Sequence, residues 1–156
     1  IEPSYTTASL FSVLIGAWVF SNFVNIAGMP EALLGLVNQS GFSPMTVIFM
    51  ILVVYLILGC VFESLSMLLL TVPIFFPIVT GLGFDGVWFG IIVVMVAELG
   101  LITPPVGMNV FVLSGVVPDI PLSKMFKGTA PFVAADILHV ALLLLVPALV
   151  LWLPNL

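Results

Sequence analysis

The sequence predicts an all-α integral membrane protein whose helices are interrupted inside the bilayer. Of its 156 residues, 63% are hydrophobic and only 6% are charged, whereas a soluble domain carries about 25% charged residues to keep its surface hydrated. Two apolar stretches are interrupted, one by a polar patch at 59–66 and one by a double proline at 104–105. We expect the first to form a re-entrant helical hairpin and the second to make a transmembrane helix discontinuous near mid-membrane.

The scarcity of charged residues, cysteine and histidine excludes several classes of protein. Lys124 and Lys127 are the only basic residues, too few to follow a phosphate backbone, so we expect the lipid bilayer and not a nucleic acid as a partner. Cys60 is the only cysteine, so no disulfide forms within the chain. There is no His-Glu-x-x-His zinc motif, residues 81–85 lack the Gly-x-Gly-Asp of an intramembrane aspartyl protease, and a single histidine argues against a hydrolytic dyad. We expect no catalytic residues and no enzyme activity.

Residues 1–44 are interpreted as a scaffold-type transmembrane helix followed by an interfacial helix. The apolar run at 8–29 reaches the roughly 20 residues that cross the hydrocarbon core. We expect a turn at 28–30 to end it and residues 31–38 to form a short helix along the membrane surface. Pro44 favours a new helix start, because proline suits the first helical position.

The stretch 45–80 is too long for one crossing and too short for two crossings joined by a water-exposed loop. Two limbs of about 15 residues each reach only ~22 Å, which is less than the thickness of the hydrocarbon core. We therefore expect a hairpin that enters and leaves on one side of the membrane and has a buried polar tip. In the second limb, Pro73 and Pro77 each remove a backbone hydrogen-bond donor.

The next apolar run is expected to form two half-helices. Asp85 is placed to cap the first of them. Pro104 and Pro105 have no amide hydrogen, so they free the carbonyls of Gly100 and Leu101, and the helix should unwind there. The two halves together are long enough to span the membrane.

Residues 118–156 are expected to contain a cytoplasmic interfacial segment and a final transmembrane helix. We expect an interfacial helix from about Pro121 and a span from 129 to Trp152, with the tryptophan in the far interfacial belt. The two lysines place this loop in the cytoplasm by the positive-inside tendency. The hairpin would then enter from the outer face, and the C-terminus would end outside.

The hairpin tip and the helix break together offer the groups that an ion site needs. Unwound carbonyls are oxygen ligands for Na⁺, and the N-termini of half-helices carry partial positive charge. We expect Na⁺ to bind the Thr103 hydroxyl and the backbone carbonyls near Gly100, and an anionic substrate group to lie at the start of the second half-helix. The candidate sodium- and substrate-binding residues are Gly59, Glu63, Ser64, Ser66, Glu98, Gly100, Leu101, Ile102, Thr103, Pro104, Pro105, Gly107 and Asn109.

Each of these assignments has a structural alternative. The double proline can be a packing kink, and Glu63 can cap the second limb of the hairpin. Glu98 is a functional candidate because it is an intramembrane acid, but it can also bond a serine or a neighbouring helix. Asp136 and His139 lie three apart on one helical face, where a structural hydrogen bond is favoured over a proton relay. For the whole chain, the alternatives to a carrier are a channel-like element and a purely structural membrane subunit of a transport complex.

Two segments of the chain resemble one protein family. Residues 63–78 read Glu-Ser-Leu-Ser-Met-Leu-Leu-Leu-Thr-Val-Pro-Ile-Phe-Phe-Pro-Ile, and residues 98–112 read Glu-Leu-Gly-Leu-Ile-Thr-Pro-Pro-Val-Gly-Met-Asn-Val-Phe-Val. Together with Trp88-Phe89-Gly90 between them, they are similar to the large membrane subunit of the TRAP (tripartite ATP-independent periplasmic) transporters. The resemblance covers most of the chain, and Gly-Leu-Ile-Thr-Pro-Pro-Val-Gly-x-Asn is its most specific part.

The resemblance implies an elevator-type secondary transporter of the bacterial or archaeal inner membrane. In that family a sodium gradient drives the import of organic acids, often a dicarboxylate or sialic acid. A periplasmic binding protein delivers the substrate, and a small membrane subunit helps to anchor the scaffold. The family protein has two inverted repeats, so this chain is expected to be the C-terminal one, with 45–117 as the transport-domain hairpin and broken helix. The N-terminal repeat would be its partner in the same permease, and Na⁺ the coupling ion, with no other cofactor.

Overall fold

A computed structural model describes residues 2–154, without the side chains of residues 2–6 and 10. All regular structure in this part of the chain is helical and no strand occurs in it, so the all-α prediction is confirmed. The helices in chain order are α1 (Glu2–Ile26), α2 (Met29–Ser40), α3 (Pro44–Gly59), α4 (Ser64–Gly81), α5 (Gly86–Ile102), α6 (Met108–Val116), α7 (Leu122–Leu145) and α8 (Ala148–Leu151).

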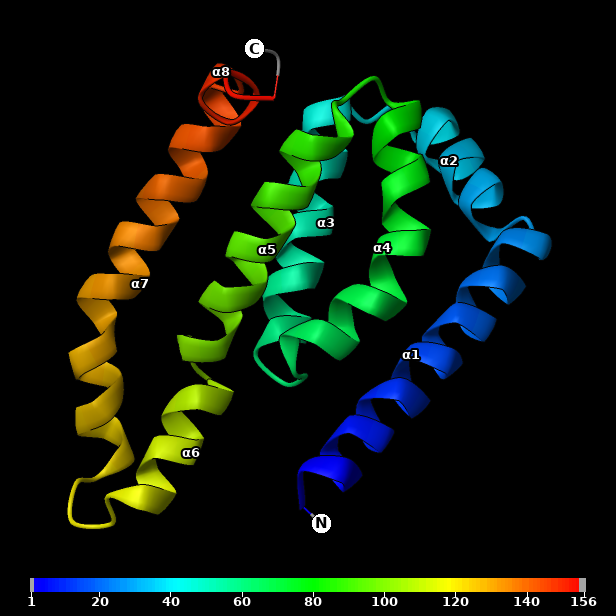
Figure 1. The fold of residues 1–156 in the computed structure, drawn as a ribbon. Coiled ribbons are helices and arrows are strands. Elements are labelled where there is room, and N and C mark those ends of the chain that lie inside the picture. The colour runs from blue at the N-terminus through cyan, green and yellow to red at the C-terminus, as the bar shows by residue number, and fades with distance from the viewer. Residues whose placement is uncertain (1, 155–156) are drawn as a thin grey trace.

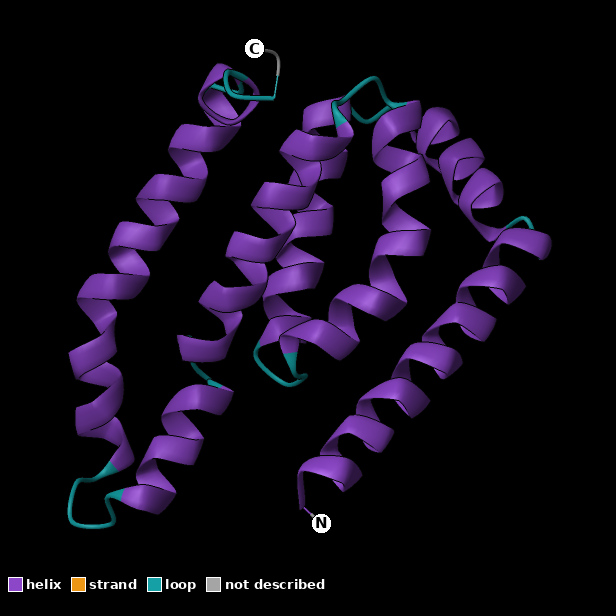
Figure 2. Cartoon of the chain, viewed as in Figure 1, coloured by secondary structure: helices purple, strands orange, loops and turns teal. Residues whose placement is uncertain are grey.

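The helices α3 and α4 form a hairpin that is flanked on one side by α5 and on the other by α1 and α2 (Figure 1). The open ends of the hairpin lie at the top of the view, and its tip points toward the middle. The helix α5 runs from the same end down to the level of the tip, where it stops, and α6 continues to the opposite end. The helix α7 returns beside both. The loop at the hairpin tip and the break between α5 and α6 therefore lie at one level (Figure 2).

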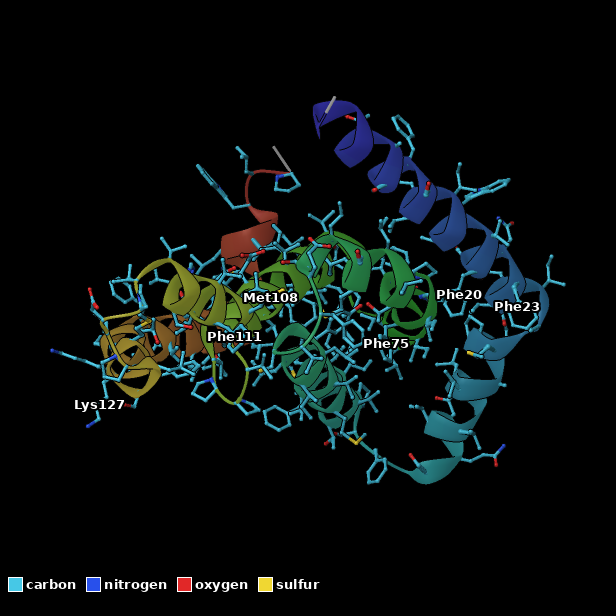
Figure 3. The ribbon with its side chains drawn as sticks, turned by 90° about the horizontal axis from the view of Figure 1, so that it is seen from below. Phe20, Phe23, Phe75, Met108, Phe111 and Lys127 are labelled. Atoms are coloured by element: carbon cyan, nitrogen blue, oxygen red, sulfur yellow. The ribbon has the colours of Figure 1, made fainter. Side chains whose placement is uncertain are left out.

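In residues 2–154, three helical segments are long and apolar enough to cross a membrane: Thr7–Ile26, Ser64–Gly81 and Leu122–Leu145. The helices α3 and α5 are also apolar but shorter, with 16 and 17 residues. Many large apolar side chains are exposed, such as Trp18 at 71%, a surface that suits lipid or further apolar protein. Lys127, by contrast, projects away from the helices at the start of α7 (Figure 3).

The starts of α3 and α5 agree with the expectations from the sequence. Ser43 is the N-cap of α3, and its Oγ accepts the Thr46 amide hydrogen at an N···O distance of 3.3 Å. Asp85 caps α5, and its Oδ1 accepts the amides of Val87 and Trp88 at 2.7 and 3.1 Å. The predicted helix start at Pro44 and the predicted cap at Asp85 are confirmed.

Two expectations about element boundaries are wrong. The helix α4 has 18 residues, longer than the roughly 15 expected, because Pro73 and Pro77 bend it without ending it (Figure 1). The segment after residue 121 does not divide into an interfacial helix and a separate span. Instead α7 continues through Pro131, since an internal proline removes only one hydrogen bond, and it ends at Leu145, before Pro147 rather than at Trp152.

The core lies where α3, α4 and α5 meet. Tyr55 and Phe89 are fully buried, and their rings meet edge-on with centroids 6.4 Å apart. The Tyr55 hydroxyl accepts a hydrogen bond from Thr71 Oγ1 at 3.0 Å. Because Tyr55 lies in α3 and Thr71 in α4, this bond joins the two limbs of the hairpin inside its core.

Trp88 fixes the far end of α7. Pro147 has no amide hydrogen, so the carbonyl of Leu143, four residues earlier, lacks its usual helical donor. The indole Nε1 of Trp88 donates to that carbonyl at 3.0 Å, and Trp88 is only 2% exposed. The ring of Phe84 stacks on the indole with centroids 5.2 Å apart. One side chain of α5 therefore supplies a hydrogen-bond donor that the end of α7 lacks.

The helices α3 and α5 meet backbone to backbone at Gly59 and Gly100. A Cβ added at Gly100 would lie 2.6 Å from the carbonyl carbon of Gly59 and 2.8 Å from its Cα. A Cβ added at Gly59 would lie 3.0 Å from the carbonyl oxygen of Ala97. Small residues allow such close approach between membrane helices. The contact fixes the end of α3, and with it the hairpin tip, against the end of α5.

We predict that Trp88→Phe lowers the free energy of unfolding by about 1–3 kcal/mol, because the Leu143 carbonyl then has no donor in an apolar interior. The control is Trp18→Phe at the exposed position on α1, which should change it by less than about 0.5 kcal/mol. Thermal unfolding of the full-length protein in detergent compares the two. Equal shifts in the unfolding midpoint would show that the indole hydrogen bond is not the cause.

We predict that Gly100→Ala also lowers the unfolding midpoint, because the added methyl group forces α3 away from α5; such overpacking costs about 1–3 kcal/mol. Gly90→Ala, in the same helix, is the matched control, since a Cβ there meets no atom within 4 Å. It should be neutral or slightly stabilising, because alanine favours a helix over glycine. Similar decreases in the unfolding midpoint of both variants would show that the close approach of α3 and α5 is not what stabilises the protein.

Candidate functional site

The first turn of α4 is capped by Glu63 at the tip of the hairpin. Glu63 Oε1 accepts the amide hydrogen of Leu65 at 2.9 Å. Its Oε2 accepts the amide and the hydroxyl hydrogens of Ser66, each at 2.9 Å. A carboxylate at this position also interacts favourably with the helix dipole. The geometry favours the capping interpretation of Glu63, which the sequence left open, over a role as a direct ligand.

The tip itself leaves several main-chain oxygens without donors. The amides of Val61 and Phe62 both bond to the carbonyl of Leu58, at 3.0 and 2.8 Å. Within the described residues, the carbonyls of Gly59, Cys60, Val61 and Phe62 accept no hydrogen bond. Each of these oxygens is available as a ligand.

The break between α5 and α6 lies where the sequence predicts it. The helix α5 ends at Ile102, the double proline follows, and α6 begins at Met108. Gly107 adopts a φ of +54°, which favours glycine, and a Cβ there would meet the Thr103 carbonyl oxygen at 3.1 Å and the Phe126 ring at 2.9 Å. The double proline is therefore more than a kink, because the chain leaves the helical conformation between two separate helices.

Hydrogen bonding at the end of α5 differs in part from the expectation. The Thr103 amide donates to the Gly100 carbonyl at 3.2 Å, so that oxygen is paired, because the last turn closes with a bond to the third residue back rather than the fourth. The Thr103 hydroxyl donates to the Leu99 carbonyl at 2.6 Å. In the part of the chain that the structure describes, the carbonyls of Leu101, Ile102 and Thr103 accept no hydrogen bond.

The N-terminus of α6 presents free amides. The first helical hydrogen bond is from the Phe111 amide to the Gly107 carbonyl at 2.9 Å, and no side chain caps the helix. The amides of Met108, Asn109 and Val110 consequently have no partner among the described residues. Asn109 is exposed in the first turn of α6. A helix start of this kind is suited to an anion.

The hairpin tip rests on the helix break. In addition to the contact between the two glycines, the Cys60 thiol donates to the Pro104 carbonyl with an S···O distance of 3.8 Å. The Ser64 hydroxyl donates to Glu98 Oε1 at 3.0 Å, which is one of the alternatives left open for Glu98. We call this meeting point of residues 59–64 and 98–107 the junction.

All of the candidate residues except Ser66 and Asn109 lie within the junction. They differ in how far they are buried. Ser66 follows the junction in the first turn of α4, and Asn109 in the first turn of α6. The buried candidates are Gly59, Gly100, Leu101 and Gly107; the half-buried ones are Ser64, Ser66, Ile102 and Thr103; the exposed ones are Glu63, Glu98, Pro104, Pro105 and Asn109.

Asp136 and His139 lie in α7, outside the junction. No hydrogen bond joins their side chains in the described residues, so the expected structural pair is not confirmed. The described chain also has no group of three His, Cys, Asp or Glu side chains that could hold a metal ion. The open main-chain oxygens and the hydroxyl of Thr103 at the junction are hard oxygen ligands, which suit Na⁺ better than a transition metal.

Sequence reasoning missed the contacts that hold the junction together. It selected Gly59 and Gly100 for their carbonyls. In the structure, the lack of a side chain at these two glycines allows the helices to pack closely. The only signal was a small residue near the end of each apolar helix. It also named Ser64 and Glu98 separately, since nothing in the sequence shows that residues 34 positions apart meet.

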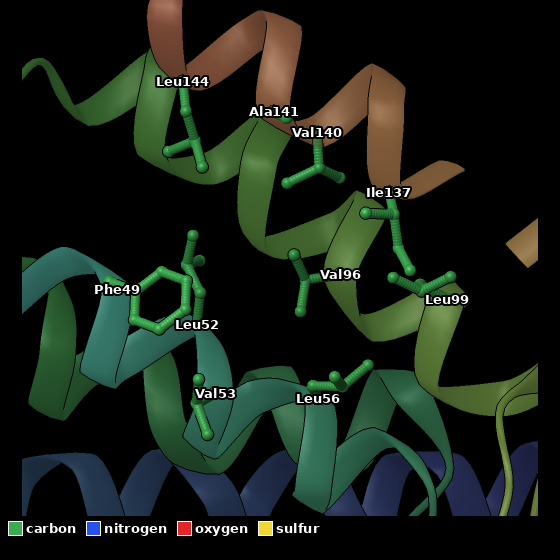
Figure 4. Close-up of a pocket in the computed structure, with 10 residues that line it drawn as sticks. All are labelled: Phe49, Leu52, Val53, Leu56, Val96, Leu99, Ile137, Val140, Ala141 and Leu144. Atoms are coloured by element: carbon green, nitrogen blue, oxygen red, sulfur yellow. The ribbon is translucent and has the colours of Figure 1, made fainter. Parts of the chain in front are cut away.

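A second feature of the surface is an apolar groove, which shares Leu99 with the junction. It lies between α3, α5 and α7 and has a volume of about 300 Å³ (Figure 4). The residues that line it are Phe49, Leu52, Val53, Leu56, Val96, Leu99, Ile137, Val140, Ala141 and Leu144. With no polar side chain in its wall, this groove is not suited to an ion or a charged substrate.

Comparison with known proteins places the chain in a family. Residues 2–149 match the model described as tripartite ATP-independent periplasmic transporter, DctM component. The C4-dicarboxylate TRAP transporter large permease protein DctM of Pseudomonas aeruginosa is 34% identical over 99% of this chain and 36% of its own length. The sialic acid TRAP transporter large permease protein SiaM of Vibrio cholerae is 32% identical over 99% of the chain and 36% of its own length.

A third relative is the isethionate TRAP transporter permease protein DctMQ of Oleidesulfovibrio alaskensis, 33% identical over 96% of the chain and 23% of its own length. The chain thus spans about a third or less of the relatives it matches. These relatives are transporter permeases and not enzymes. Since the family match covers nearly the whole sequence, the chain belongs to the DctM family, the large permease component of the tripartite ATP-independent periplasmic transporters.

Proposed function

We propose that this chain supplies one hairpin and one broken helix of a sodium-coupled permease for small organic acids, and that the junction binds Na⁺. The observation that carries this proposal is the set of unpaired main-chain oxygens on both sides of the junction. In a membrane interior such oxygens need partners, and irregular backbone persists there only against protein or a water-filled cavity. A bound cation supplies the missing partner.

The proposed ligands come from both elements. The break offers the carbonyls of Leu101, Ile102 and Thr103, and the tip offers those of residues 59–62. The Thr103 hydroxyl donates its only hydrogen to Leu99, which leaves the lone pairs of its oxygen free for a cation. Unwound carbonyls of broken helices are the usual ligands for coupling ions in secondary transporters.

The start of α6 is the proposed contact for an anionic group of the substrate. Its three unpaired amides point out of a helix of nine residues, and Asn109 adds an amide side chain at the same place. The relatives are named for C4-dicarboxylates, sialic acid and isethionate, each of which carries a carboxylate or a sulfonate. Backbone amides at a helix N-terminus bind such groups.

The membrane arrangement that we propose has α3 and α4 entering and leaving on one side, as a re-entrant hairpin, while α5 and α6 together cross. The bend in α4 supports this arrangement, because the tip stops at the level of the break although α4 has the length of a span (Figure 1). Lys124 and Lys127 put the start of α7 in the cytoplasm, at the end of the bundle opposite the open ends of the hairpin.

We further propose that residues 45–117 belong to a mobile, elevator-type transport domain, whereas 1–44 belong to the scaffold and 118–156 form the cytoplasmic segment and final span. Because the chain spans about a third of its relatives, the proposed partners include the rest of the permease with its N-terminal repeat. A small membrane subunit and a periplasmic substrate-binding protein would complete the transporter in the inner membrane.

We predict that Thr103→Ala, introduced into the full-length permease with its partners, raises the Na⁺ concentration for half-maximal uptake at least tenfold, because an oxygen ligand is lost. Thr103→Ser keeps that oxygen and should stay within about threefold; tenfold corresponds to about 1.4 kcal/mol. Uptake into proteoliposomes at graded external Na⁺ measures both. The control is Thr80→Ala, whose hydroxyl likewise bonds a carbonyl four residues back, at 3.0 Å, but lies at the other end of the hairpin. Unchanged sodium dependence in Thr103→Ala would overturn the assignment.

We predict that replacing both Pro104 and Pro105 by alanine abolishes sodium-dependent uptake, because the new amides can pair with the carbonyls of Gly100 and Leu101 and restore the helix. The permease should still assemble, as judged by size-exclusion chromatography of the purified complex. Retention of normal sodium-coupled uptake by an assembled variant would show that the open carbonyls are not required.

A further inference from the structure

Glu98 and Ser64 join α5 to the side of the hairpin tip that leads into α4. Glu98 lies about one turn before the break, and Ser64 is the first residue of α4. The Ser64 hydroxyl donates to Glu98 Oε1 at 3.0 Å. Among the described side chains, this is the only hydrogen bond between two side chains that links the tip to α5.

The two sides of the tip are held differently. On the α3 side, Gly59 and Gly100 are in backbone contact, and the Cys60 thiol reaches the Pro104 carbonyl. These contacts use backbone and a buried side chain. On the α4 side, the Ser64 hydroxyl bonds Glu98, and Met67, one turn further on, belongs to the same buried cluster as Val96 and Ala97 of α5. Loss of the Ser64 bond would therefore loosen the α4 side of the tip while leaving the α3 side attached.

The Glu98 carboxylate is well suited to hold this hydroxyl. No Lys or His side chain forms an ion pair with it among the described residues, and a hydrogen bond to a charged acceptor is shorter and stronger than one between neutral groups. Its partner Ser64 is also in the first turn of α4, where the helix dipole favours negative charge. Glu63, the other acid at the tip, already accepts three hydrogen bonds within its own cap.

We propose that Glu98 is a positioning residue, which holds the hairpin tip on the helix break through Ser64 and thereby keeps the oxygens of the two elements at one site. Its effect on Na⁺ affinity rests on the function proposed above, whereas its effect on the tip does not. Glu98 acts here through the hydroxyl that it binds and not as a ligand of the ion.

Cys60 reports directly on the position of the tip. It is the only cysteine of the chain, it is 4% exposed, and its thiol lies against the break. Lifting of the tip would expose this thiol to reagents. The rate of its alkylation by N-ethylmaleimide therefore measures how often the tip leaves the break.

The test uses the full-length permease in membranes, with cysteines other than Cys60 replaced. Ser64→Ala and Glu98→Ala should each raise the alkylation rate about tenfold, and the double variant should be no faster than either, because all three lose the same bond. Glu98→Gln keeps an oxygen acceptor and should stay within about threefold of the parent. Ser43→Ala, which removes a capping hydroxyl at the far end of the hairpin, controls for general loosening and should leave the rate unchanged.

Uptake by the same variants tests the second half of the proposal. Glu98→Ala should raise the Na⁺ concentration for half-maximal uptake about tenfold with little change in the maximal rate, and Glu98→Gln should restore it. The positioning role would be overturned if the increases in alkylation rate of Ser64→Ala and Glu98→Ala multiplied in the double variant. It would also be overturned if Glu98→Gln were alkylated as fast as Glu98→Ala. The expected alkylation pattern in a permease whose uptake ignores Na⁺ would support the positioning role and refute the sodium site.

Discussion

The fold depends on how each main-chain oxygen without a helical donor finds a partner in an apolar setting. Prolines create most of these oxygens, and the chain deals with them in different ways. The indole of Trp88 satisfies the Leu143 carbonyl, and a tightened last turn satisfies that of Gly100. At the junction the carbonyls on both sides of the contact stay open. We propose that these open oxygens at the junction have a partner from outside the chain, because buried main-chain oxygens in native proteins are normally paired.

Close packing brings these open oxygens into one region. The limbs of the hairpin are tied internally by Tyr55 and Thr71, and the contact of Gly59 with Gly100 ties the hairpin to α5. The result is a unit in which α3, α4 and α5 share one core. A site made from two such elements is sensitive to their relative position, so contacts that bind no ion can still set its affinity.

Local sequence signals predicted the elements, and long-range contacts account for what they missed. The helix start at Pro44, the cap at Asp85 and the break at the double proline depend on residues within one or two turns, so composition and spacing were sufficient. The continuity of α7 through Pro131 was not predictable in this way, since one lost hydrogen bond need not end a long helix whose other hydrogen bonds remain. Likewise, 41 positions separate Gly59 from Gly100, and no local sequence pattern predicts which small residues come into contact. For the site, the sequence selected the region, and the structure was needed to recognise the residues that cap or pack, such as Glu63 and Gly100.

The most direct test is a structure of the full-length permease determined in sodium and again in choline, at a resolution that reveals bound ions. We expect density in sodium, and not in choline, within coordination distance of the Thr103 hydroxyl, the carbonyls of residues 101–103 and at least one tip oxygen. Carbonyls that bond only to water or to other parts of the protein in both conditions would contradict it.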